Sequence, residues 1–241
     1  MSEHKIVLLT GSSGKLGTAI VHSNTRFTLL KPSSNELDIT NPKKIKDYFN
    51  KYNFSAIIHC AAMARMGQCE KNPMDAIKVN IIGTANLVNA TIMKGNIRFI
   101  HISSDGVYYC DRGNYKENDE TIPYNIYGWT KLGSETAVRI LKDYSILRTS
   151  FFEPDNIPFH NAGVDVYSSK LPINEFAKAI LILVSSEQIY KVLNEIITLA
   201  KKDNGKFLDF WKNFGKVVHE LTPINKLLIK KNKKNEKISL F

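Results

Sequence analysis

A tyrosine and a lysine stand four positions apart in this sequence, at Tyr127 and Lys131. On a helix this spacing places the two side chains on one face, about 6 Å apart. A free phenol has a pKa of about 10, which is too high for ready proton donation at neutral pH, and a neighbouring ammonium would lower that pKa by stabilising the phenolate. The pair therefore has the chemistry of a general acid. Taken alone, the same spacing is also typical of an ordinary contact on a helix surface.

A serine upstream supplies a second polar group. The run over residues 97–102 predicts a strand, and Ser103, Ser104 and Asp105 follow it. Because the carboxyl ends of parallel strands face the ligand crevice, we expect Ser104 to hydrogen-bond a carbonyl that Tyr127 protonates while a nicotinamide gives hydride. A shift of one residue in register would put Ser103 in that place, and a plain turn is the non-catalytic alternative.

Three glycines predict a binding site for a dinucleotide. Gly11, Gly14 and Gly17 follow the apolar run over residues 6–9 and open a predicted helix. The first glycine permits a tight turn, the others let the backbone approach a pyrophosphate and the sheet, and the helix N-terminus offers unpaired N–H groups and a positive dipole end. A strand-to-helix turn without a ligand is the alternative.

The turn over residues 10–17 resembles the Thr-Gly-x-x-Gly-x-x-Gly segment of the extended short-chain dehydrogenase/reductase superfamily. The resemblance implies that an Asp-hydrophobic pair before the next helix contacts adenine, and that small side chains after the third strand lie against the cofactor. The residues that it places at the cofactor are Thr10, Gly11, Ser13, Gly14, Lys15, Leu16, Gly17, Asp38, Ile39, Cys60, Ala61, Ala62, Asn80, Tyr127 and Lys131.

Position 31 favours NADPH over NAD. An acidic residue roughly 20 positions beyond the first glycine would bind the adenosine ribose of NAD. The residue 20 positions beyond Gly11 is Lys31, and a cation at the end of the second strand would pair with a 2′-phosphate. We therefore expect NADP as the cofactor, with NAD as the alternative cofactor. The alternative for Lys31 is a solvated loop lysine without a ligand.

The stretch from Ser103 to Glu135 is similar to the dTDP-4-dehydrorhamnose reductases, and the similarity extends over residues 5 to about 152. It implies an NAD(P)H-dependent oxidoreductase that reduces the keto group of a nucleotide-activated 4-keto-6-deoxy sugar in polysaccharide biosynthesis. The catalytic residues would be Ser104, Tyr127 and Lys131, and the substrate contacts would include Ser104, Asp105 and Arg148. Two alternatives stay open: an NAD-dependent nucleotide-sugar epimerase and a non-catalytic cofactor-binding regulatory subunit.

The sequence departs from that family at three places. Gly106 stands where the family has tyrosine, and residues 63–66 replace its usual segment after the paired alanines. Within that replacement, Arg65 would meet a nucleotide phosphate or lie on a surface loop. The polar connection over residues 154–163 is short, so we expect a reduced substrate lobe.

Alternating strands and helices must position these groups. Strand patterns near residues 6–9, 27–30, 56–60, 97–102 and 144–147 alternate with helical patterns. Such alternation predicts an α/β fold with a doubly wound parallel sheet, the Rossmann fold. We expect a dinucleotide-binding domain over residues 1–150, a reduced substrate-binding portion over 151–224 and a basic tail over 225–241. His59 and His101 fall in predicted strands, where we expect the sheet to satisfy both imidazoles.

The distribution of charge along the chain indicates which classes of partner to expect. Its 241 residues carry a net charge of +10, and half of that charge lies in the last 17 residues, where six lysines stand against one glutamate. A basic tail on an enzyme does not indicate a nucleic-acid partner, and we expect a nucleotide sugar and leave a homodimer open. Three scattered cysteines indicate neither a disulfide framework nor a metal site. Without an apolar run of about 20 residues or a secretory signal, we expect a cytoplasmic protein with no membrane span.

Overall fold

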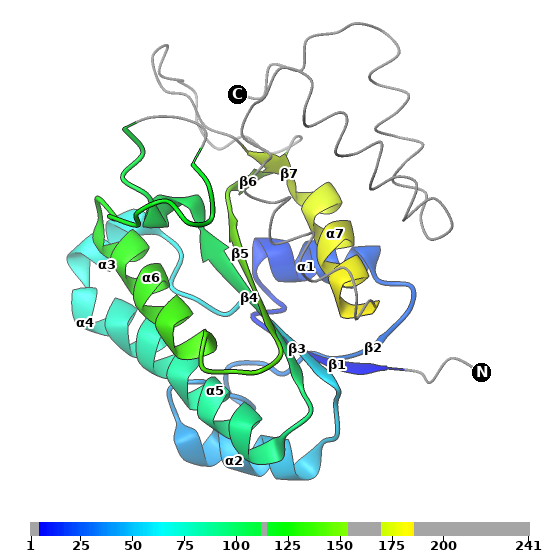
Figure 1. Cartoon of the computed structure of the whole chain (residues 1–241). Helices are drawn as coiled ribbons and strands as arrows, with labels where there is room; N and C mark the ends of the chain where they lie inside the picture. The colour runs from blue at the N-terminus through cyan, green and yellow to red at the C-terminus, as the bar shows by residue number, and fades with distance from the viewer. Residues whose placement is uncertain (1–4, 112–114, 154–169, 186–241) are drawn as a thin grey trace, which may run out of the picture.

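The computed structural model describes residues 5–111, 115–153 and 170–185 (Figure 1). Most of the predicted 151–224 portion and the whole 225–241 tail lie outside the described residues. Five parallel strands form the central sheet in the order β2-β1-β3-β4-β5. These strands are β1 (Ile6–Thr10), β2 (Thr28–Leu30), β3 (Ala56–His59), β4 (Arg98–Ser104) and β5 (Tyr144–Thr149).

The sheet is doubly wound, which confirms the predicted fold class. The chain moves outward from β1 to β2 and then returns to the other side of β1 with β3. At such a switch point the two loops that leave the sheet diverge and open a crevice at the carboxyl ends of the strands. The registers Thr10↔His59, His59↔His101 and Ser104↔Thr149 align the strand ends there.

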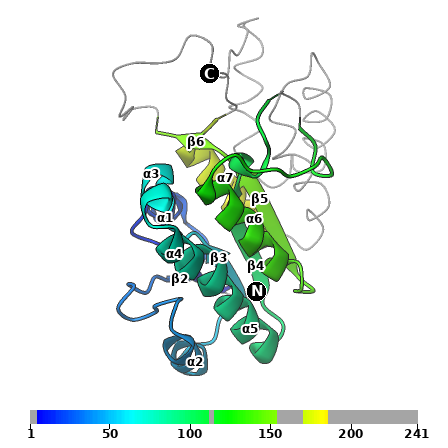
Figure 2. The same cartoon turned by 90° about the vertical axis from the view of Figure 1, so that its left-hand side faces the viewer.

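Helices cover both faces of the sheet (Figures 1 and 2). Alternate residues of β1 point to opposite faces of the sheet. Val7 and Leu9 pack with α1 (Lys15–Ser23) and α7 (Ile173–Ser185) on one face, whereas Leu8 packs with a second group of helices on the other face. That second group consists of α2 (Pro42–Lys51), α5 (Gly83–Lys94) and α6 (Ile126–Val138). Both cores are built from strand side chains that alternate with period two and helix side chains on one stripe.

The predicted helix from residue 73 to about 94 is present, but a π-helical turn interrupts it. It runs through α4 (Pro73–Ala76), the π-helix η1 (Ile77–Ile82) and α5, and it ends at Gly95 with φ 72°. The preceding α3 covers Met66–Lys71. Turns of this kind occur often at functional sites, and this one contains the buried Asn80.

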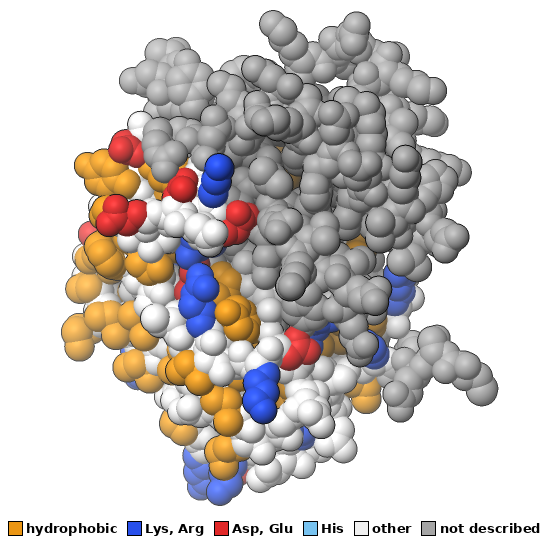
Figure 3. Space-filling model, viewed as in Figure 1, with side chains coloured by type: hydrophobic (Ala, Val, Ile, Leu, Met, Phe, Trp, Pro, Cys, Tyr) orange, Lys and Arg blue, Asp and Glu red, His pale blue; other side chains and the backbone are white. Residues whose placement is uncertain are grey.

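Shorter elements complete the described fold. A 3₁₀ turn, η2 (Asp105–Val107), follows β4, and a small parallel pair joins β6 (Phe151–Phe152) to β7 (Leu171–Pro172). In the described parts of the chain, no helix is both long and apolar enough to cross a bilayer. Figure 3 shows hydrophobic side chains along the left-hand side of the surface, where α3 and α4 lie, and Met66 and Met74 are exposed there.

Candidate active site

The glycine turn packs directly on the end of β3. Gly11 has φ 68°, and a Cβ on it would lie 2.6 Å from the Ala61 nitrogen. A Cβ on Gly17 would lie 2.2 Å from the carbonyl oxygen of Gly11. Only glycine fits either position, so the turn is held tightly against Cys60 and Ala61. No side chain caps α1 at Gly14, which leaves the first amides of the helix available to an anion.

Lys131 is a buried ammonium beside this turn. Its side chain is 2% exposed, and burial lowers its pKa to about 8 although the charge of Glu135 opposes that change. Among the described residues, the hydrogen-bonding atom near its Nζ is His101 Nε2, at 3.5 Å. A buried ammonium with unused donors fits a ligand rich in oxygen, such as a cofactor ribose.

Ser104 faces Tyr127, and Ser103 does not. The Ser104 hydroxyl accepts from the Gly106 N–H at 3.0 Å and donates to Asp105 Oδ1 at 3.2 Å, and it lies close enough to Tyr127 to lower the pKa of that phenol. Ser103 Oγ instead donates to Glu135 Oε1, 2.6 Å away. The tertiary structure therefore decides the register that the sequence left open.

The pKa of Tyr127 moves opposite to the expected direction. Burial raises it to about 12, the charge of Asp105 raises it further, and the hydrogen bond with Ser104 opposes both. The prediction that Lys131 lowers the pKa of Tyr127 is wrong for the protein by itself, because the ammonium lies toward His101. Tyr127 is thus firmly protonated at neutral pH, which is the form that a proton donor requires.

Two side chains and one close approach fix the start of α6. Asn125 Oδ1 accepts from the Gly128 N–H at 2.7 Å, and Glu70 Oε1 accepts from the Ile126 N–H at 2.8 Å. A Cβ on Gly128 would lie 2.2 Å from the carbonyl oxygen of Gly106. The helix therefore packs against η2 with no room for a side chain, next to Tyr127.

Asn80 ties the loop after β3 to α6. Its Oδ1 accepts from the Met63 N–H at 2.7 Å, and its Nδ2 donates to the Met63 carbonyl at 3.1 Å and to Thr130 Oγ1 at 2.8 Å. Thr130 Oγ1 in turn donates to the Tyr127 carbonyl at 2.8 Å. These bonds occupy the amide, so Asn80 holds the loop after β3 against α6.

The two strand histidines differ. Thr84 Oγ1 donates to the Asn80 carbonyl at 2.7 Å, so His59 Nε2 donates to Thr84, and His59 Nδ1 accepts from Thr10 at 2.7 Å. This confirms that the structure satisfies His59. His101 Nε2 contacts Ser134 Oγ at 2.9 Å, but its buried Nδ1 has no partner among the described residues.

The predicted adenosine contacts lie in the segment between β2 and α2. Lys31 is exposed directly after β2. Asp38 Oδ1 accepts from the Thr40 N–H and hydroxyl at 2.9 and 2.8 Å, which lowers the pKa of Asp38. Ile39 is buried against Gly83. In the glycine turn itself, Ser13 and Lys15 are exposed, and Lys15 forms an ion pair with Glu153.

Of the predicted substrate contacts, Asp105 lies beside Tyr127 and Arg65 is exposed at the start of α3.

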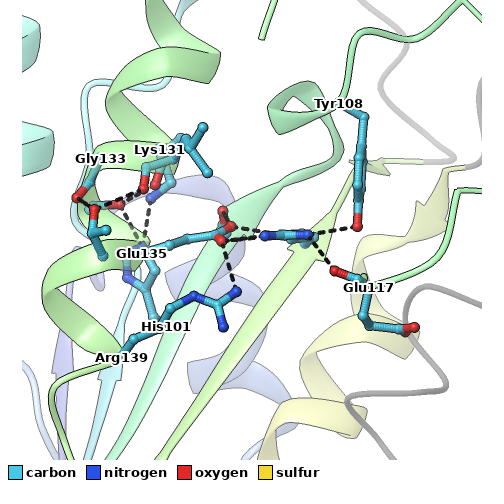
Figure 4. Close-up of polar contacts among 12 residues, drawn as sticks. His101, Tyr108, Glu117, Lys131, Gly133, Glu135 and Arg139 are labelled. Atoms are coloured by element: carbon cyan, nitrogen blue, oxygen red, sulfur yellow. Dashed lines mark hydrogen bonds and ion pairs between the residues drawn. The ribbon is translucent and has the colours of Figure 1, made fainter. Parts of the chain in front are cut away.

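The prediction for Arg148 needs correction (Figure 4). Its guanidinium is buried, and it donates to Glu135 from Nε at 3.0 Å and from Nη2 at 2.7 Å. Its Nη1 donates to Tyr108 Oη at 2.8 Å. Sequence reasoning missed this ion pair, for which the only signal was an acid four residues after Lys131.

Comparison with known proteins matches residues 5–155 to a family described as "RmlD substrate binding domain". The dTDP-4-dehydrorhamnose reductase of Mycolicibacterium smegmatis is 34% identical over 150 residues, covering 60% of this chain and 45% of that protein. The methionine adenosyltransferase 2 subunit beta of Pongo abelii is 31% identical over 142 residues, covering 55% and 42%. The chain thus matches about half the length of its curated relatives, or less.

Solved structures share the fold. The dTDP-4-dehydrorhamnose reductase of Bacillus anthracis, determined in complex with NADP, superposes with a TM-score of 0.69 at 26% identity. The superposition covers 77% of this chain and 72% of that one. The glycine turn, Lys131 and the Ser104–Tyr127 pair described above all lie within residues 5–155, the range that the family matches.

Proposed function

The chain belongs to the RmlD substrate-binding-domain family, and on that premise we propose that it is an NADPH-dependent reductase of the keto group of a nucleotide-activated 4-keto-6-deoxy sugar. One observation carries the proposal: at the crevice edge of the sheet, Tyr127 lies beside Ser104, and the buried Lys131 ammonium has no ion-pair partner among the described residues, next to a turn that admits only glycine at positions 11 and 17. That arrangement combines a proton donor with a place for a dinucleotide.

The residues present fit such a cofactor. The turn at Gly11 and Gly17 and the uncapped N-terminus of α1 would hold the pyrophosphate, and Lys31 would meet a 2′-phosphate. Lys131 would donate to the nicotinamide ribose. Bound NADPH supplies the hydride for the reduction. The relative solved with NADP supports this choice of cofactor.

The protein's own residues handle the proton. Tyr127 donates from Oη to the carbonyl oxygen of the substrate as that oxygen gains charge, and the Ser104 hydroxyl hydrogen-bonds the same oxygen. Such general acid catalysis contributes about 10²–10⁴-fold in rate. The raised pKa of Tyr127 keeps the proton in place until the carbonyl becomes basic.

Turnover by the purified protein tests the proposal. NADPH should be oxidised in the presence of a nucleotide-linked 4-keto-6-deoxy hexose, and Tyr127→Phe should abolish turnover while NADPH binding persists. No oxidation across a panel of keto-sugars would reject the substrate assignment. An epimerase would instead retain NAD and consume no reduced cofactor.

A second candidate is a cofactor-binding regulatory subunit, because one group of relatives carries the name of a subunit. Such a protein would co-purify with an enzyme and alter its turnover, and Tyr127→Phe would leave that effect unchanged. The proton donor favours the reductase, because a binding module has no use for the Ser104–Tyr127 pair.

We also propose a cytoplasmic homodimer, with a boundary between cofactor and substrate portions near residue 150. The support for the dimer is the set of apolar side chains exposed on α4 and α6, among them Met74 and Trp129 at 75% and 53%. Light scattering on the purified protein at micromolar concentration tests it, and a monomeric mass would reject it.

A further inference from the structure

The ion pair between Glu135 and Arg148 lies one helical turn from Lys131. Glu135 follows Lys131 by four residues on α6, a spacing at which opposite charges on a helix normally meet. In this structure they do not pair. Glu135 Oε1 accepts from Ser103 Oγ at 2.6 Å and from Arg148 Nε at 3.0 Å, and Oε2 accepts from Arg148 Nη2 at 2.7 Å.

Arg148 is itself fixed on its far side. Its Nη1 donates to Tyr108 Oη at 2.8 Å and to the Glu117 carbonyl at 3.2 Å, and the guanidinium carbon lies 5.1 Å from the centre of the Tyr108 ring. The planar fork of arginine matches both oxygens of a carboxylate at once, which a lysine cannot do. The carboxylate of Glu135 is therefore held toward β5 and away from Lys131, as Figure 4 shows.

Among the described residues, Glu135 is the ionised group that could otherwise form an ion pair with Lys131. The other titratable groups around the ammonium are His59 on β3, His101 on β4 and Cys60 after β3. Burial lowers the pKa of His59 to about 3 and that of His101 well below its usual range. Burial also raises the pKa of the Cys60 thiol to about 12, so all three are neutral.

We propose that Arg148 is a positioning residue that holds the Glu135 carboxylate away from Lys131 and so keeps the Lys131 ammonium free to bind the nicotinamide ribose. The inference rests on the proposed function for the identity of the ligand. Without Arg148, Glu135 would remain buried one turn from an unpaired ammonium, and the two would form the ion pair that their spacing allows.

Titration of the full chain with NADPH, followed by fluorescence, tests this inference. In Arg148→Met the Kd for NADPH should rise by about 10- to 100-fold, the loss expected for charge-assisted hydrogen bonds. In Glu135→Gln/Arg148→Met the competing carboxylate is gone, so the affinity should return to that of the wild type. Arg139 provides the matched control, because its Nη2 lies 3.6 Å from the same carboxylate but its side chain is 51% exposed. Arg139→Met should bind NADPH normally.

Thermal unfolding of each variant separates folding from positioning. A folded Arg148→Met protein with wild-type affinity would overturn the inference, and so would a double variant as weak as the single one. If Arg148→Met does not fold, Arg148→Lys and Glu135→Gln/Arg148→Lys replace the pair, with the same direction expected.

A second experiment tests the role of Arg148 without any cofactor. A crystal structure of the Arg148 variant should show Lys131 and Glu135 as an ion pair, and separated side chains would refute the positioning role. Absence of NADPH binding by the wild-type protein would reject the proposed function and leave this structural outcome to be decided by itself.

Discussion

A methyl group added to Gly128 should disable the site without unfolding the protein. A Cβ at this position would lie 2.2 Å from the carbonyl oxygen of Gly106, whereas such contacts essentially never fall below 3.0 Å. The atoms must therefore part by about 0.8 Å, and both neighbours are constrained: Gly106 N–H donates to Ser104 Oγ, and Gly128 follows Tyr127 directly. Overpacking of this kind costs about 1–3 kcal/mol of unfolding free energy.

The effect on turnover should exceed the effect on stability. A displacement near 1 Å at a reacting group costs about 10²-fold in rate, so Gly128→Ala should lower kcat/KM by about that factor. Gly133→Ala on the same helix is the control, because its Cβ would meet the flexible end of Ile81 at 2.8 Å. Alanine there should gain up to about 1 kcal/mol from helix propensity, offset in part by the movement of Ile81. Steady-state kinetics and urea unfolding measure both quantities. Equal kcat/KM for the two variants would refute the proposed packing of α6 on η2.

Further predictions separate the roles of neighbouring residues. Ser104→Ala should lower kcat with little change in stability, whereas Ser103→Ala should cost about 1 kcal/mol of unfolding free energy and spare kcat; the reverse result would show that the register is wrong. Lys31→Glu should weaken NADPH by about 10- to 100-fold and leave NADH nearly unchanged, as measured by paired titrations; equal losses for both would exclude a 2′-phosphate contact. Because burial lowers the pKa of Lys131 from 10.5 to about 8, the unfolded chain binds more protons than the folded one between these pH values, so stability should rise with pH across that window. Lys131→Met should remove that rise in urea unfolding, and identical profiles for the two proteins would contradict it.

The elements of the fold were accessible from the sequence because their signals are local. The glycine turn, the apolar run before it and the helix from residue 73 to Gly95 each depend on a few neighbouring residues. The π-helical turn at Ile77–Ile82 was not predicted; its buried Asn80 bonds Met63 and Thr130 from other elements, and such contacts between distant segments leave no local signal in the sequence.

The site was predicted in part. Tyr127 and Lys131 share α6, and Ser104 ends β4 at the crevice, as the motif indicated. The predicted shift in the pKa of Tyr127 was wrong in direction, because burial and the nearby carboxylate of Asp105, both set by the tertiary fold, raise that pKa. The i,i+4 spacing of Tyr127 and Lys131 does not by itself lower the pKa of the phenol, since the Lys131 ammonium lies toward His101.

The sequence by itself determined which residue types are available for chemistry and which strand or helix carries each, because turns, periodicity and i,i+4 spacing are properties of short segments. Only the tertiary structure decided which partner each charge takes. Glu135 could pair with Lys131 on its own helix or with Arg148 on β5, 13 residues away. Burial settles that choice: the fork of Arg148 satisfies both carboxylate oxygens where water cannot, and Lys131 is left without an ion-pair partner among the described residues.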